Sequence, residues 1–154
     1  MSELIFQNRQ RLQRLDMDRL KEITRTVLEE LQPSPGYSLG VHLVAPNEMA
    51  LVNETFLNHT GSTDVITFDH RAGGGEPLHG ELYICVGDAM EQAREFKTHW
   101  AEEVVRYIVH GILHLNGYDD LTPPERRKMK RRENLLMKKL GEQYALKRLA
   151  VKKG

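Results

Sequence analysis

Residues 99–117, HWAEEVVRYIVHGILHLNG, are the segment that most restricts how this chain can fold. The large apolar side chains recur at helical spacing along one side of the segment: Val105, Ile108, Ile112 and Leu115. A helix this apolar has to be enclosed by other elements, so the segment predicts a buried central helix. Gly117 follows the last apolar position and is a typical helix end.

The remaining sequence alternates between strand-like and helix-like segments. Alternating apolar and β-branched residues predict short strands at residues 4–10, 37–45, 62–69 and 78–86. Helical periodicity predicts further helices, the first with Asp16 as its N-cap, at residues 16–32, 46–58, 87–97 and 125–144. The 154 residues are enough for one domain with a sizeable core. We therefore predict an α+β fold, a single domain over residues 1–154 with a small mixed β-sheet packed with helices.

Composition excludes several classes of protein. Cys85 is the only cysteine, so the chain has no internal disulfide and no cysteine-rich zinc site. The first residues lack an apolar run long enough for a signal peptide, and no segment approaches the roughly 18 apolar residues of a membrane helix. We expect a cytoplasmic protein that does not bind membranes.

Charge is unevenly distributed along a chain whose formal net charge is zero. Residues 126–154 hold twelve Lys or Arg and two Glu, a balance of +10, which leaves −10 for residues 1–125. The pattern predicts a basic C-terminal helix, from about residue 123, on an acidic body. A lone charge run is more often a solvated helix, so a nucleic-acid surface needs independent support.

His110 and His114 are four residues apart in the expected central helix, so both imidazoles project from one face. That spacing allows both to bind one metal ion, and catalytic zinc commonly takes three protein ligands and a water. A turn at Gly117 would bring the carboxylate of Asp119 or Asp120 back toward them. An isolated histidine pair is as often a surface or core feature. Here the apolar flanks would partly bury the pair, and a buried polar side chain needs a partner.

Gly111 distinguishes this pattern from the zinc peptidases of the HExxH type. Those enzymes have Glu directly after the first histidine as general base. Glycine has no side chain to act as a base, although a similar metal geometry is retained. A peptidase built on this helix would lack its base.

The stretch HGILHLNGYDD, residues 110–120, closely resembles the HGxLHLxGYDH signature of the YbeY family of bacterial metal-dependent endoribonucleases. MALVNETFLNHTGSTDVITFD resembles the family's LNxxYRxxDxPTDVLSF, GELYICVGDAMEQAREF its GDIxIS strand and following helix, and PPERRKMKRRENLLM its last helix. The resemblance covers most of the chain. It implies a zincin-like domain with the metal site at the end of the central helix, one zinc ion per chain and cleavage of single-stranded RNA. It also implies a role in ribosomal RNA maturation, especially at the 3′ end of small-subunit RNA, and in ribosome quality control.

The third metal ligand of the family is usually histidine, whereas Asp120 stands at that place here. Some branches of the family look as though they use aspartate there. An aspartate oxygen can bind zinc and makes the site more anionic and harder. The resemblance therefore implies that His110, His114 and Asp120 are the metal ligands.

A second departure is Leu57, at the place of an arginine that the family assigns to catalysis. Leucine cannot bind phosphate, so the role is lost or another side chain takes it. His59 is the nearest candidate catalytic residue, with His70 as another, because an imidazole can contact phosphate or transfer a proton. The alternative for each is a solvated loop histidine.

The preferred function is that of a zinc-dependent endoribonuclease, in which Arg126, Arg127 and Lys130 hold the RNA strand without reading its sequence. Cleavage by the 2′-OH of the RNA itself also fits the sequence. The main alternative is a non-catalytic, zinc-containing ribosome-assembly factor that binds RNA, which Leu57 favours. A metallopeptidase-like hydrolase comes third, weakened by Gly111. The expected partners are ribosomal RNA and the ribosomal subunit, and the sequence leaves the oligomeric state open.

Overall fold

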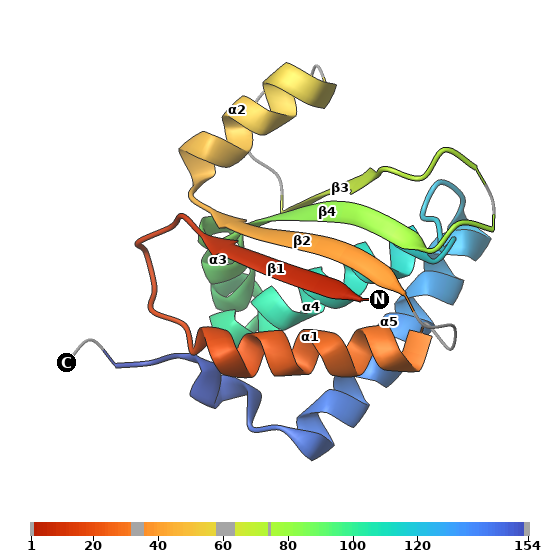
Figure 1. Cartoon of the computed structure of the whole chain (residues 1–154). Helices are drawn as coiled ribbons and strands as arrows, with labels where there is room; N and C mark the ends of the chain where they lie inside the picture. The colour runs from red at the N-terminus through yellow and green to blue at the C-terminus, as the bar shows by residue number, and fades with distance from the viewer. Residues whose placement is uncertain (1, 32–35, 58–63, 74, 153–154) are drawn as a thin grey trace.

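A four-stranded mixed sheet forms the centre of the molecule (Figure 1). The computed structural model describes residues 2–31, 36–57, 64–73 and 75–152. The strands lie side by side in the order β1 (Glu3–Asn8), β2 (Tyr37–Val44), β4 (Leu78–Cys85) and β3 (Val65–Asp69). Strands β1, β2 and β4 are parallel, and β3 pairs with β4 in the antiparallel direction. The predicted α+β fold with a small mixed sheet is confirmed.

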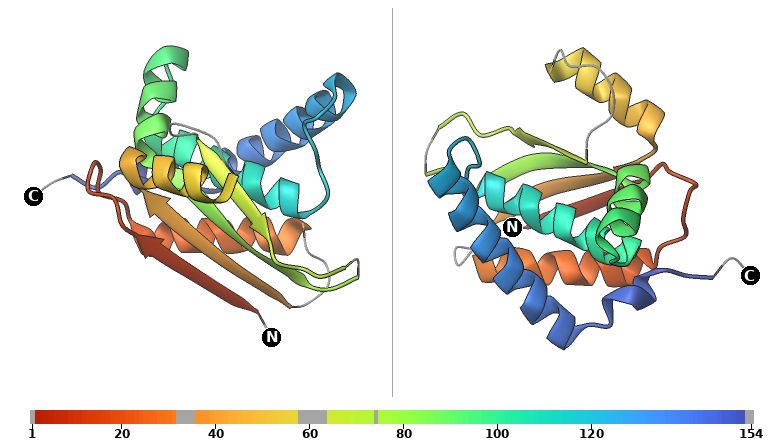
Figure 2. Two further views of the ribbon diagram at one scale, coloured as in Figure 1. Left: turned by 90° about the horizontal axis from the view of Figure 1, so that it is seen from above. Right: turned by 180° about the vertical axis from the view of Figure 1, so that it is seen from behind.

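One face of the sheet is covered by helices α1 (Met17–Leu31) and α4 (Trp100–Leu115), as Figures 1 and 2 show. The predicted apolar side of α4 is buried to within 1% exposure at each position: Val105, Ile108, Ile112 and Leu115. Burying one such aliphatic side chain contributes about 1.5–3 kcal/mol. This face of α4 therefore fixes the helix against the sheet and provides a rigid base for the residues on its other side.

The other helices surround this central pair. Helix α2 (Pro46–Leu57) lies over the opposite face of the sheet, where Met49 and Val52 pack with Ile66 in a second, smaller core. Helices α3 (Val86–Phe96) and α5 (Pro123–Gln143) flank α4 in the left view of Figure 2. A short 3-10 helix, η1 (Leu146–Leu149), follows α5. None of the helices in the described ranges is long and apolar enough to cross a bilayer.

Most element boundaries agree with the sequence-based expectation to within a few residues. The carboxylate of Asp16 accepts the amide of Arg19 at 3.1 Å, which confirms the expected N-cap of α1. Strand β3 is described from Val65, and Asp64, predicted to belong to it, forms a bend; the predicted residues 62 and 63 lie outside the described residues. Helix η1 was not anticipated, because a single 3-10 turn is too short to show a hydrophobic period. It nevertheless adds the fully buried Leu149 to the core.

Candidate metal centre

The C-terminal end of α4 turns the chain back along the helix. Gly117 has a φ of +90°, a left-handed conformation that glycine adopts without strain, so the predicted helix end is confirmed. The amide of Gly117 donates to the carbonyl of His114, and that of Tyr118 to the carbonyl of Leu113, both at 3.1 Å. This pair of bonds is a Schellman motif, which satisfies the last helical carbonyls. The reversal carries residues 118–120 back toward the histidines.

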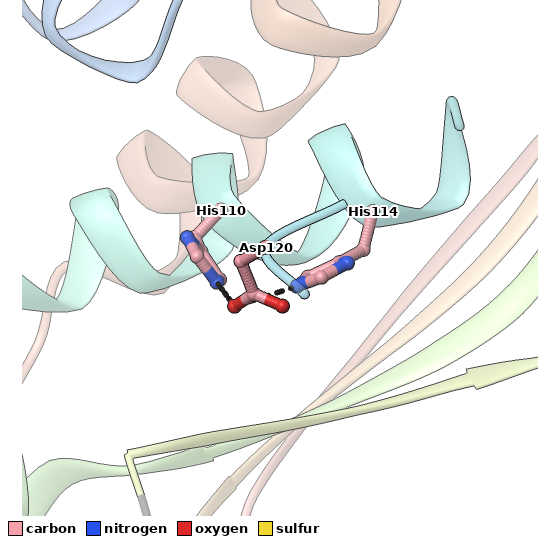
Figure 3. Close-up of side chains that lie close together, drawn as sticks. All are labelled: His110, His114 and Asp120. Atoms are coloured by element: carbon pink, nitrogen blue, oxygen red, sulfur yellow. Dashed lines mark ion pairs between the residues drawn. The ribbon is translucent and has the colours of Figure 1, made fainter. Parts of the chain in front are cut away.

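His110, His114 and Asp120 meet at this reversal (Figure 3). Oδ2 of Asp120 lies 3.6 Å from Nε2 of His114 and 3.9 Å from Nε2 of His110. One ligand atom from each residue lies within 4.8 Å of the other two. Tetrahedral bonds of about 2.1 Å to one ion would place ligand atoms about 3.4 Å apart, so the group is close to metal-binding geometry. Within the described ranges, no other group of this kind occurs.

The three side chains are half-buried and open to water on one side. Each imidazole is 27% exposed and the carboxylate of Asp120 is 43% exposed. Two neutral imidazoles and one carboxylate are the ligand types that zinc accepts, and three protein ligands leave a fourth position for water. The residues present therefore fit a catalytic rather than a closed structural metal site.

Asp119, the other candidate for the third ligand, has a local role. Its Oδ1 accepts the backbone amide of Asp120 at 2.8 Å. Such short-range bonds are typical of aspartate in turns. Asp119 shapes the turn, and Asp120 is the residue whose carboxylate faces the histidines.

A buried carboxylate lies behind His110. Oε1 of Glu133 contacts Nδ1 of His110 at 3.0 Å, and Oε2 accepts from Nη1 of Arg106 at 2.8 Å and Nζ of Lys130 at 3.1 Å. Burial by itself raises the pKa of Glu133, but the hydrogen bonds from His110, Lys130 and Arg106 outweigh it and hold the pKa at about 2. Glu133 is therefore an anion at neutral pH.

Sequence reasoning missed both Glu133 and Arg106. One signal was present, because Glu133 is the only acidic residue between Arg126 and Lys139. A single carboxylate inside a run of basic residues indicates a specific partner for that carboxylate. The run does not show that the partner is His110, which lies 23 positions earlier in the sequence.

A cleft of about 710 Å³ opens beside the histidines. Helices α3, α4 and α5 form most of its walls, which include Gln92, Phe96, Arg106, Tyr107, His110, Asp120, Arg126, Arg127, Lys130 and Glu133. The structure therefore brings the three basic residues singled out in the sequence into the same cleft as two of the expected metal ligands. A strand lying in this cleft would contact both sets of side chains.

The first turns of α5 place the basic residues in the same cleft as two of the candidate metal ligands. Thr122 is the N-cap of the helix: its hydroxyl accepts the amide of Glu125 at 3.3 Å and donates to the carboxylate of the same residue at 2.7 Å. Arg126 donates to the carbonyl of Asp120 at 3.2 Å. Arg127 is exposed and makes no side-chain hydrogen bond or ion pair with the part of the chain that the structure describes, so its guanidinium is available to a ligand.

Of the two histidines considered for the missing arginine, the structure describes His70. Leu57 is the last residue of α2, and His59 lies outside the described residues, so its role stays a prediction. Nε2 of His70 contacts Oε2 of Glu81 at 2.8 Å, and His42 contacts the other oxygen of that carboxylate at the same distance. These two histidines belong to a polar network on the sheet and do not line the cleft.

Comparison with known proteins identifies the family. Residues 5–141 match the family described as Endoribonuclease YbeY. The chain belongs to the YbeY family. An Endoribonuclease YbeY from Chlorobium luteolum is 40% identical over 89 residues, which cover 58% of this chain and 64% of that relative. One from Salinibacter ruber is 35% identical over 120 residues, covering 71% of this chain and 76% of the relative.

A solved structure supports the same assignment. The solution structure of TM1509 from Thermotoga maritima superposes with a TM-score of 0.65 at 26% identity, covering 93% of this chain and 91% of TM1509. The resemblance of the sequence to YbeY, a metal-dependent endoribonuclease family, is confirmed. Membership of YbeY supports a nuclease activity, the hydrolysis of phosphodiester bonds in RNA.

Proposed function

We propose that this YbeY family member is a zinc-dependent, single-strand-specific endoribonuclease that matures ribosomal RNA at the 3′ end of the small-subunit RNA and serves ribosome quality control. The observation that carries the proposal is the joint position of His110, His114 and Asp120 beside a cleft lined by basic side chains. One zinc ion per chain would be held by these three residues. The cytoplasm, with ribosomal subunits as partners, is the proposed location.

In this proposal one group of residues binds the zinc ion and another binds the RNA strand. A bound zinc ion supplies a water whose pKa is lowered toward neutrality. Arg126, Arg127 and Lys130 would contact the phosphates of a strand in the cleft, since cationic side chains position a backbone without reading its sequence. The exposed ring of Phe96, on the α3 wall, offers a surface on which a base can stack.

The role of the family arginine needs another side chain here, because Leu57 cannot bind phosphate. We propose His59 for this role, because it follows Leu57 by two residues and leads toward β3. His59→Ala is expected to lower cleavage on the order of 10²-fold, the scale of one acid–base group. Zinc content and melting temperature should stay at the wild-type level.

Leu57→Arg completes the test of this position. A gain in cleavage would mean that position 57 faces the substrate and that the family mechanism is latent in this chain. If His59→Ala cleaves as fast as the wild type, His59 is not the replacement. If Leu57→Arg is also without effect, the non-catalytic alternative is favoured.

That second candidate function is a zinc-containing ribosome-assembly factor that binds RNA without cutting it, and Leu57 is the observation in its favour. Metal-free and zinc-restored protein, assayed on a single-stranded RNA, separates the two. Zinc-restored cleavage that His114→Ala abolishes would support the enzyme. RNA binding without cleavage in the zinc-restored wild type would support the assembly factor.

The peptidase alternative has a structural argument against it. A Cβ atom at Gly111 would lie 2.6 Å from Cδ2 of Leu82, a fully buried residue of β4. The position after the first histidine therefore faces the packed interior. A glutamate there would have to displace core side chains before it could act as a base.

A further inference from the structure

We propose that Glu133 is the positioning residue of the metal centre, holding His110 through Nδ1 in the ring orientation and tautomer that a metal ion at Nε2 requires. The contact joins Oε1 of Glu133 on α5 to Nδ1 of His110 on α4 at 3.0 Å. The proposal deepens the proposed function and rests on its metal site. It assigns a task to the one acidic residue inside the basic run of α5.

The chemistry of the contact determines which imidazole nitrogen is free. An ionised carboxylate has no proton to donate, so it only accepts. Nδ1 of a neutral His110 must then carry the proton, and Nε2 keeps its lone pair. Nε2 is also the atom of His110 that faces Oδ2 of Asp120, at 3.9 Å. The hydrogen bond therefore presents a free lone pair on the side where the proposed ligands meet.

Glu133 is itself held in place. Its side chain is 5% exposed, and a buried carboxylate is retained only where other groups satisfy it. Arg106 and Lys130 both donate to Oε2, and the same Nη1 of Arg106 lies 2.9 Å from Oδ1 of Asn134. The second oxygen is thus fixed by two cations, so the first oxygen has little freedom to leave His110. A rigid acceptor of this kind sets the ring plane as well as the tautomer.

The two histidines of the site differ in this respect. No carboxylate contacts Nδ1 of His114 within the ranges that the structure describes. The orientation of His114 comes from its place in the last turn of α4, just before the Schellman motif. An effect of Glu133 should therefore appear at His110 and be absent at His114, which gives each experiment an internal control.

The direct test is the tautomer of the two histidines in metal-free, full-length protein labelled with ¹⁵N at histidine. The spectra are recorded over a pH series and compared where both rings give the ¹⁵N shifts of a neutral imidazole. We expect His110 of the wild type to carry its proton on Nδ1. A wild-type His110 with its proton on Nε2 would overturn the proposal, and this measurement requires no variant.

The variants Glu133→Gln and Glu133→Ala, with Glu142→Gln as matched control, measure the consequence for the metal. Glu142 lies on the same helix but is exposed and away from the cleft. Competition with a chromophoric chelator gives the zinc dissociation constant of each protein. Removal of a partner behind a metal ligand typically weakens binding 10–100-fold, which we expect for Glu133→Ala. Glu133→Gln should lie between, because an amide can still accept from Nδ1, and Glu142→Gln should match the wild type.

Each outcome supports or overturns the proposal. Loss of the Nδ1–H form of His110 in Glu133→Ala, with His114 unchanged and zinc affinity lowered, supports a positioning role. Unchanged tautomers or unchanged zinc affinity in folded Glu133 variants would overturn it. If the wild type binds no zinc, the proposed metal site fails, while the tautomer of His110 still decides the role of Glu133. If both variants fail to fold, the wild-type spectrum alone decides it.

Discussion

Gly111→Ala is expected to destabilise the fold although it replaces glycine in the middle of a helix. The new Cβ would lie 2.6 Å from Cδ2, 3.0 Å from Cδ1 and 3.3 Å from Cγ of Leu82, which is fully buried. Overpacking of a core by one such group typically costs about 1–3 kcal/mol. The higher helix propensity of alanine relative to glycine stabilises the folded state by about 1 kcal/mol. The net loss in the free energy of unfolding should be up to about 2 kcal/mol.

Gly141→Ala, on α5, is the matched control for this substitution. A Cβ at Gly141 meets no atom within 4 Å, so only the propensity effect remains. This variant should be stabilised by up to about 1 kcal/mol. The difference between the two variants isolates the steric cost of placing a methyl group between α4 and β4.

Urea unfolding of metal-free protein, followed by circular dichroism, measures both variants without a contribution from zinc binding. Thermal melts give a second reading, at roughly 2–4 °C per kcal/mol for a chain of this size. If Gly111→Ala is stabilised as much as Gly141→Ala, the close approach of α4 to Leu82 is not a constraint on the fold. The structural argument against a glutamate base at position 111 would then fail with it.

Three further predictions follow from the site and the core. Asp120→Ala should weaken zinc binding, measured by chelator competition, far more than Asp119→Ala does. Asp120→His should retain zinc. A larger loss of affinity in Asp119→Ala would mean that Asp119, not Asp120, is the third ligand. Arg127→Ala should weaken binding of single-stranded RNA and reduce the slope of log affinity against log salt by about 0.7, the value for one lost phosphate contact. An unchanged slope in fluorescence anisotropy, with Lys138→Ala as control, would remove Arg127 from the path of the strand. Burial raises the pKa of the Cys85 thiol to about 11, so at pH 8 its thiolate fraction is on the order of 10⁻³, against about a quarter for an ordinary thiol. Iodoacetamide should therefore label the native protein at least about 100-fold more slowly than the urea-unfolded protein, and equal rates would contradict the burial of Cys85.

The elements that could be predicted from sequence are those with a long, regular pattern. The apolar side of α4 and the end of that helix at Gly117 follow from local spacing, and both agree with the structure. The turn at Gly117 predicts that Asp119 or Asp120 returns toward the histidines, the resemblance to YbeY implies Asp120, and the structure places the carboxylate of Asp120 there. Local information was sufficient wherever the interacting residues belong to one helix and its cap.

Contacts between residues of different helices or strands could not be predicted in this way, because they depend on how those elements pack against each other. The contact between His110 and Glu133 requires α5 to run along α4, and nothing in either helix alone specifies that crossing. The sequence gives His70 as a candidate catalytic residue, but the pairing of β3 with β4 brings its imidazole within hydrogen-bond distance of Glu81. Asp64, which the alternating pattern includes in β3, forms a bend before the residues that pair with β4.

The backbone segments that carry the three proposed ligands differ in how readily they unfold locally. His110 and His114 are carried by a helix whose inner side is fully packed, and backbone amides of such helices exchange with solvent only when much of the fold opens. Asp120 belongs to a short, half-buried turn that follows Gly117, and amides of such turns exchange through local opening. Opening of the turn would remove the carboxylate while both imidazoles stay in place. A metal ion held by these three residues would therefore lose Asp120 as a ligand before either histidine, and its release should follow the opening of the turn.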